Sequence, residues 1–122
     1  MKSLKSSFTT DQISNYLNTE EIVRDTVQQI MKDFDVFSLE IHFSGHIATA
    51  YQELHSQLVA HIEHLMHHSN SKLISVLYRI DLSEEQIRKG CLSLPNYNFI
   101  EALAHLIIER ELKKVLSRRY YK

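Results

Sequence analysis

Histidines are the residues of this sequence whose type and spacing suit chemistry best. Seven of the eight lie between His42 and His68, and neutral imidazole is a common ligand of transition metals. His61 and His64 are one helical turn apart, as are His64 and His68, so either pair can chelate an ion. His61 and His68 are about 10 Å apart along a helix axis, so all three cannot bind the same ion.

A metal site at this cluster needs a further ligand from another helix, and Glu101 and His105 are the available residues. The sequence has no H-E-x-x-H motif, no Glu-x-x-His pair and no Cys/His cluster. We therefore expect a solvated helix flank with partly packed imidazoles, and no cofactor. If an ion binds, the candidate ligands are His61, His64, His68 and His105.

The same histidines allow a second use, which is a response to acid. Protonation of all eight, near a reference pKa of about 6.5, would take the formal charge from −1 to +7. Positive charges gathered on one flank repel one another and weaken the packing of a helical bundle.

Basic residues gather in the last ten positions, and the candidates for an interaction surface are Lys113, Lys114, Arg118 and Arg119. Cations in a final helical turn complement the helix dipole, which is the structural interpretation. The functional interpretation is contact with a nucleic-acid backbone, with Tyr120 and Tyr121 stacking on bases. A helix-turn-helix is excluded because its recognition helix would carry no Lys or Arg.

Arg110 shares a helix side with apolar residues, where an unpaired charge is costly. We expect it to form a partly buried ion pair with a carboxylate, and Asp81 and Glu84 are the favoured partners. The alternative is that Arg79 or Arg110 holds the carboxylate of a ligand through two parallel hydrogen bonds.

The glycine and cysteine counts exclude several classes of protein. Gly45 and Gly90 are the only glycines, whereas phosphate-binding loops need several at fixed spacing. The sequence also lacks a nucleophile elbow and a paired-carboxylate motif, so it names no catalytic residue and we expect a non-enzymatic protein. Cys91 has no second cysteine to pair with, which favours a cytoplasmic location.

The elements that must position these residues are helices. The clearest periodicity covers 46–68, where six apolar residues fall on one side: Ile47, Tyr51, Leu54, Leu58, Ile62 and Leu65. Other helices are predicted at 11–34 with a possible break near 18, at 73–80, for a turn or two from the capping box at Ser83 to Gly90, and at 97–119. The helix at 73–80 is apolar on most sides, which predicts a central position.

Apolar and polar residues alternate over 37–43, which is the pattern of a strand. A single strand needs a partner, so the alternatives are pairing with 91–94, an extended packed linker, or pairing with the same segment of a second chain.

The predicted last helix has two apolar sides. Leu103 and Ile107 lie on one side near its start, and Leu112 and Leu116 lie nearly opposite further along. If its own chain covers only one side, the other side meets another chain, which predicts a dimer.

Two stretches of the second half resemble a group of small all-helical bacterial proteins with no assigned activity. They are Leu77-Tyr78-Arg79-Ile80-Asp81-Leu82-Ser83-Glu84 and Leu106-Ile107-Ile108-Glu109-Arg110-Glu111-Leu112-Lys113-Lys114-Val115. The resemblance is a pattern of core and charge positions without a catalytic signature. It implies a cytoplasmic helical protein from a bacterium.

Taken together, the sequence predicts one all-α domain over 1–122, with a flexible tail at 1–9. About four main helices are expected to pack as a bundle, with a short extended segment near 36–43. No segment is long and apolar enough for a membrane span. We expect an interaction or scaffold protein that acts through self-association, as a dimer, or through a protein partner. The alternatives are nucleic-acid binding through the basic last helix and a histidine-lined bundle that binds a metal or small ligand.

Overall fold

The computed structural model describes residues 19–120, which form an all-α fold. Its α-helices are α2 (Glu20–Asp35), α3 (Ala50–His68), α4 (Asn70–Ile80), α5 (Glu84–Leu92) and α6 (Phe99–Tyr120), and a 3-10 turn, η1 (Ile47–Thr49), precedes α3. No strand occurs within 19–120. The described part therefore has five α-helices rather than about four, because the segment after Ser83 forms a full helix. The predicted tail at 1–9 and the predicted helix start at 11 lie outside the described residues.

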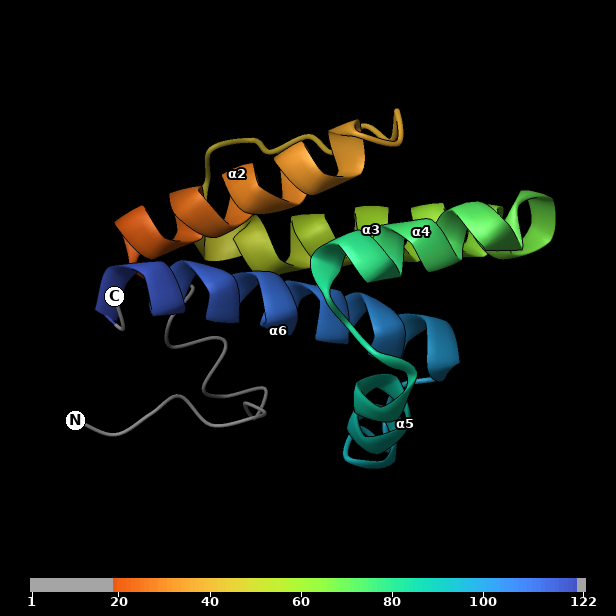
Figure 1. The fold of residues 1–122 in the computed structure, drawn as a ribbon. Coiled ribbons are helices and arrows are strands. Elements are labelled where there is room, and N and C mark those ends of the chain that lie inside the picture. Colours follow the sequence, from red (N-terminus) through yellow and green to blue (C-terminus); the bar gives the residue numbers. More distant parts are fainter. Residues whose placement is uncertain (1–18, 121–122) are drawn as a thin grey trace.

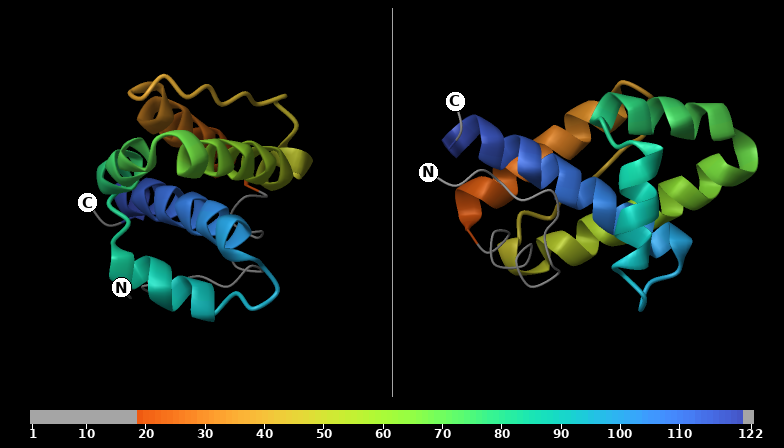
Figure 2. Two further views of the ribbon diagram at one scale, coloured as in Figure 1. Left: turned by 90° about the vertical axis from the view of Figure 1, so that its right-hand side faces the viewer. Right: turned by 60° about the horizontal axis from the view of Figure 1, so that its bottom comes forward.

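Helix α6 is the centre of the fold. It runs between α2, α3 and α4 on one side and α5 on the other, and it packs against all four (Figures 1 and 2). Leu103 and Ile107 on one of its sides, and Leu112 and Leu116 on the other, are all at most 1% exposed. The expectation that one side of this helix needs a second chain was therefore wrong, because other helices of the same chain cover both apolar sides.

Helix α4 lies at the edge of the fold rather than at its centre, so its predicted central position was also wrong. Leu73, Val76 and Ile80 are buried, but Ile74 is 59% exposed and Tyr78 is 87% exposed. The central place belongs to α6, which is longer and carries apolar residues along most of its length.

The predicted strand does not form, although the burial of its residues does alternate. Leu39 and Ile41 are buried while Glu40 and His42 are exposed. Residues 39–44 instead form an irregular linker between α2 and η1. A strand was the wrong element here because the backbone of this segment bonds to side chains rather than to another strand.

Three side chains of α3, each one turn from the next, hold this linker. The carboxylate of Glu53 accepts hydrogen bonds from the backbone N–H and the hydroxyl of Ser44, at 2.9 and 2.6 Å. The amide of Gln57 accepts from the N–H of His42 and donates to its carbonyl, both at 2.7 Å. His61 Nε2 lies 2.7 Å from the carbonyl oxygen of a third linker residue, Glu40. These backbone groups of the linker are thereby satisfied without a strand partner.

Replacing Gln57 by alanine is expected to lower the free energy of unfolding by about 1–2 kcal/mol, because two backbone hydrogen bonds are lost together. Urea unfolding followed by circular dichroism measures this. Gln52 is exposed on the same helix and gives the matched control. An equal effect of Gln57→Ala and Gln52→Ala would show that the hydrogen bonds between Gln57 and the linker do not contribute to stability.

The capping box that opens α5 is present as predicted. The hydroxyl of Ser83 accepts from the N–H of Gln86, and the side chain of Gln86 accepts from the N–H of Ser83. The helix continues past Gly90, where the turn was predicted to end. A Cβ at Gly90 would collide with the side chain of Leu106, so this glycine allows α5 and α6 to approach closely. Within 19–120, no helix is both long and apolar enough to cross a bilayer.

Candidate functional site

The structure does not bring the candidate metal ligands together. The rings of His64 and His68 are close, with centroids 4.3 Å apart, and both side chains are exposed. His61 is bonded to the linker carbonyl of Glu40, and His105 is buried in contact with Tyr51. Among residues 19–120, no group of three or more His, Cys, Asp or Glu side chains is arranged to hold a metal ion.

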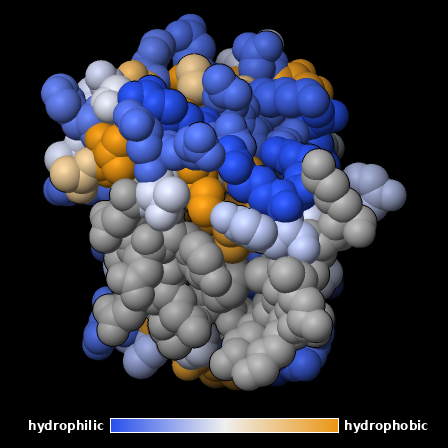
Figure 3. Space-filling view, turned by 90° about the vertical axis from the view of Figure 1, so that its left-hand side faces the viewer, coloured by the Kyte–Doolittle hydropathy of each residue, from blue (hydrophilic) through white to orange (hydrophobic). Residues whose placement is uncertain are grey.

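The cations of the last helix face the acidic first helix of the described chain. Arg119 forms ion pairs with Asp25 at 2.7 Å and with Glu21 at 3.3 Å, and Arg118 donates to Gln29 at 2.8 Å. Figure 3 views the end of the molecule where α2 begins and α6 finishes, and hydrophilic residues cover most of the described surface there. Since two carboxylates partly neutralise Arg119, the nucleic-acid interpretation loses part of its electrostatic support.

Lys113 and Lys114 are more buried than Arg118 and Arg119. Lys113 is 4.0 Å from the carboxylate of Glu109, one turn earlier on α6. Lys114 is 3.3 Å from Asp33 on α2 and 3.1 Å from Glu111. Their side chains are only 12% and 19% exposed, so neither presents its ammonium group as an open docking surface.

A buried polar cluster joins α2, α4 and α6. Asp33, whose side chain is 4% exposed, accepts hydrogen bonds from Arg79 at 3.1 Å, from Gln29 at 3.1 Å and from Lys114 at 3.3 Å. Burial pushes the pKa of Asp33 upward, but hydrogen bonds from Glu111, Gln29 and Lys114 together hold it below its usual value. Asp33 is therefore an ionised carboxylate facing two cations.

Glu111 in the same cluster is completely buried. Burial, followed by the hydrogen bond to Asp33, raises the pKa of Glu111 to about 9, although Lys114 opposes the shift. At neutral pH Glu111 is therefore a protonated acid that donates its proton to the Asp33 carboxylate. Such a pair of carboxyl groups shares one negative charge instead of burying two.

Arg110 forms the expected ion pair with Asp81, but the pair is less buried than expected, because the Asp81 side chain is 83% exposed and that of Arg110 is 25% exposed. Its guanidinium donates to the carboxylate of Asp81 and to the Asp81 carbonyl, both at 3.0 Å. Asp81 has a φ of 67° and ends α4 in the left-handed conformation. Arg110 therefore ties the end of α4 to α6, which is the structural role predicted for it.

His105 is the centre of a second polar cluster, between α3 and α6. Its Nδ1 lies 2.6 Å from the hydroxyl of Tyr51, which lies 3.3 Å from the hydroxyl of Tyr97. His55 stacks on both tyrosine rings. Burial, aided by the nearby His55, lowers the pKa of His105 to about 4, so its imidazole is neutral at pH 7. Its Nε2 is buried with no hydrogen-bond partner among residues 19–120.

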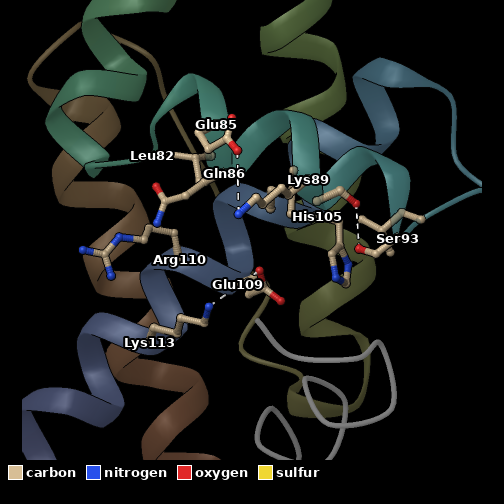
Figure 4. Close-up of a pocket in the computed structure, with 12 residues that line it drawn as sticks. Leu82, Glu85, Gln86, Lys89, Ser93, His105, Glu109, Arg110 and Lys113 are labelled. Atoms are coloured by element: carbon tan, nitrogen blue, oxygen red, sulfur yellow. Dashed lines mark hydrogen bonds and ion pairs between the residues drawn. The ribbon is translucent and has the colours of Figure 1, made fainter. Parts of the chain in front are cut away.

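The His105 ring also lines a pocket of about 280 Å³ between α5 and α6 (Figure 4). Its apolar wall includes Leu82, Leu94 and Leu106. Its charged lining residues are Glu85, Lys89, Glu109, Arg110 and Lys113. Apolar walls with a few polar groups are typical of small-molecule sites. Each of the three cations already has a carboxylate neighbour, since Lys89 lies 3.7 Å from Glu85, Arg110 3.0 Å from Asp81 and Lys113 4.0 Å from Glu109.

Sequence reasoning named His105 as a possible metal ligand but missed both its tyrosine partners and the pocket. The helical spacing of Glu101 and His105 drew attention to the start of α6. Nothing in local periodicity shows that Tyr51 and Tyr97 approach His105 from other elements, since periodicity reports one helix at a time. A comparison of the chain with protein families, curated proteins and solved structures gave no match.

Proposed function

We propose that this chain is a non-enzymatic helical interaction protein, and that it acts through the outer side of α4. The observation that carries the proposal is an uncharged exposed stripe on this helix. The stripe consists of Ser71, Ile74, Ser75 and Tyr78, which fall within about 100° of one another around the helix.

An exposed helix side normally carries charged residues, whereas the centres of protein interfaces are depleted in charge and enriched in tyrosine. The two serines are small and let another helix approach closely, and Tyr78 offers a large contact area. Leu73, Val76 and Ile80 anchor the opposite side of α4 in the core, so the stripe is held rigid before any partner arrives. A rigid surface loses less entropy on binding.

The proposed partner is a second copy of the chain, and the proposal includes a cytoplasmic location because Cys91 is the only cysteine. Both copies present the same uncharged stripe, so a two-fold arrangement can place α4 against α4. This moves the expected dimer contact from the last helix, where the structure removed its basis, to α4.

Light scattering coupled to size-exclusion chromatography tests this proposal over a range of about 10 µM to about 1 mM chain. We expect dimer to accumulate with concentration in the wild type. Ile74→Lys and Tyr78→Lys are expected to remain monomeric, because a dimer would bury an unpaired ammonium group at its centre.

Val36 provides the matched control, since it is an apolar residue of similar exposure (55%) at the end of α2. Val36→Lys is expected to dimerise like the wild type. A wild type that stays monomeric at the highest concentration, or an equal loss of dimer in Val36→Lys, would rule out self-association through α4.

A further inference from the structure

His64, His67 and His68 differ from the other histidines of the described chain. Within residues 19–120 they make no hydrogen bond or ion pair, and all three side chains are exposed. The remaining histidines each have a polar partner in the fold: His42, His46, His55, His61 and His105. The end of α3 therefore carries imidazoles that packing and hydrogen bonding do not account for.

The rings of His64 and His68 form a pair on one side of α3. These residues are one helical turn apart, and their ring centroids are 4.3 Å apart. Two imidazoles that bind one ion at neighbouring coordination positions, each through a nitrogen about 2.0–2.1 Å from the metal, have ring centres roughly 4–5 Å apart. The pair is therefore spaced to chelate one ion with little movement. His67 lies about 100° around the helix from His68 and is outside this pair.

The place of the pair at the end of α3 also favours a bound cation. The helix ends at His68, and the carbonyl groups of a last helical turn carry a partial negative charge. Ile62 and Leu65 in the same stretch are buried, so the core fixes this turn before an ion arrives. Ligands that are held in place in this way lose less entropy on binding.

Imidazole nitrogens select the kind of ion. Mg²⁺ and Ca²⁺ take oxygen ligands, so they are not expected here. A zinc site normally has three or four protein ligands, whereas no third His, Cys, Asp or Glu among residues 19–120 completes a group with this pair. Cu²⁺ and Ni²⁺ accept a tetragonal set of nitrogen and oxygen ligands, in which two neighbouring nitrogens and several waters suffice. The exposure of both rings leaves room for those waters.

From these observations we propose that His64 and His68 form a binding site for Cu²⁺ or Ni²⁺ on the surface of α3. One nitrogen of each imidazole binds the ion, and water or a small ligand occupies its other positions. Both ligands come from one helix of one chain, so the site does not depend on self-association through α4.

Isothermal titration of the full chain at pH 7.5, in a buffer that does not bind metals, tests the proposal. We expect one Cu²⁺ per chain to bind with a Kd of about 10 µM or below. Ni²⁺ is expected to bind at the same site at least about tenfold more weakly, because affinity for nitrogen ligands rises from Ni²⁺ to Cu²⁺. Mg²⁺ is expected to give no heat of binding.

His64→Ala and His68→Ala each leave a single imidazole of the pair. Each is expected to weaken Cu²⁺ binding at least about tenfold, because the second ligand no longer binds within the same molecule. Both positions are exposed and alanine is the best helix former, so folding is not at risk. His67→Ala, at an exposed position of the same turn, is the matched control and should bind Cu²⁺ like the wild type.

Pulsed electron paramagnetic resonance of the Cu²⁺-loaded protein counts the bound imidazoles, since the remote ring nitrogens modulate the signal. Two imidazoles are expected in the wild type and in His67→Ala, and one in His68→Ala. The proposal is overturned if the wild type shows fewer than two. It is also overturned if the double variant His64→Ala/His68→Ala binds Cu²⁺ as tightly as the wild type, or if His67→Ala loses as much affinity as His68→Ala.

Discussion

Replacing Asp33 by alanine is expected to lower the free energy of unfolding by about 3–5 kcal/mol. The Asp33 carboxylate is 4% exposed and pairs with Arg79 and Lys114. Its removal deprives both cations of this carboxylate and leaves Lys114 with its contact to Glu111. Glu111 also loses the acceptor of its proton. Breaking one member of a buried ionic cluster is costly because the remaining charges stay in a medium that solvates them poorly. Urea unfolding followed by circular dichroism measures the change.

Asp25 provides a matched control for this experiment. It lies on the same helix and also pairs with a cation of α6, Arg119, at 2.7 Å. Its side chain is 41% exposed, and a pair this open to water contributes about 1 kcal/mol or less. If Asp33→Ala costs no more than Asp25→Ala, the buried cluster is not a main source of stability.

Replacing Glu111 by glutamine is expected to stabilise the protein at pH 8 and to reduce the dependence of its stability on pH. The folded state raises the pKa of Glu111 from 4.5 to about 9, first through burial and then through Asp33. The folded state therefore holds a proton that the unfolded chain has already released at neutral pH. Glutamine donates the same kind of hydrogen bond to Asp33 without needing to bind a proton.

The sign of the effect follows from that raised pKa. The contribution of Glu111 to the free energy of unfolding is fully present below the unfolded pKa of about 4.5. It is lost as the pH rises toward about 9. Within this window the wild type loses up to about 1.4 kcal/mol per pH unit relative to Glu111→Gln. This corresponds to a fall in Tm of roughly 4–6 °C per unit. Thermal unfolding of both proteins at pH 7, 8 and 9 gives the comparison.

The pH range of this experiment separates Glu111 from the groups that titrate in acid, and the shifted pKa values of Cys91 and Lys113 are common to the wild type and Glu111→Gln. The pKa of His105 is lowered to about 4, so its contribution is lost as the pH falls below about 6.5. The pKa of Asp33 is also lowered, and its contribution is lost in acid. Glu63→Gln, at an exposed position of α3, controls for the loss of one carboxylate. Parallel Tm curves for the wild type and Glu111→Gln would contradict a protonated Glu111.

Both polar clusters leave buried atoms without a hydrogen-bond partner among residues 19–120, namely Nε2 of His105 and the two carboxyl oxygens of Glu111. The Asp33 cluster pairs its own charges across α2, α4 and α6, so its effect is on stability. The His105 cluster satisfies Nδ1 but not Nε2 among the described residues.

The helices were predictable because their signals are local. Apolar residues at three- and four-residue steps placed 46–68 and 97–119 within a few residues of the observed elements. The capping box at Ser83 and Gln86 is likewise a contact between neighbours in sequence. Arg110 was expected to meet a carboxylate, Asp81 or Glu84, because an unpaired charge beside apolar residues is costly wherever the helices lie, and the structure has the pair with Asp81.

The alternation over 37–43 shows where a local signal was incomplete. It correctly indicated that Leu39 and Ile41 would be buried. It did not indicate a strand, because the same burial pattern arises when a linker is bound by side chains of Glu53 and Gln57 on α3. Burial patterns report which side of a segment meets the core, and not what its backbone bonds to.

The sequence by itself determined the all-helical content, most helix positions and the absence of common phosphate-binding and nucleophile motifs, since these depend on neighbours along the chain. The tertiary structure decided which helix is central and which distant residues meet. Asp33 pairs with Arg79 and Lys114, and Tyr51 bonds to His105. Such contacts depend on how the helices are packed and rotated against one another, and a helix's own periodicity leaves that packing open.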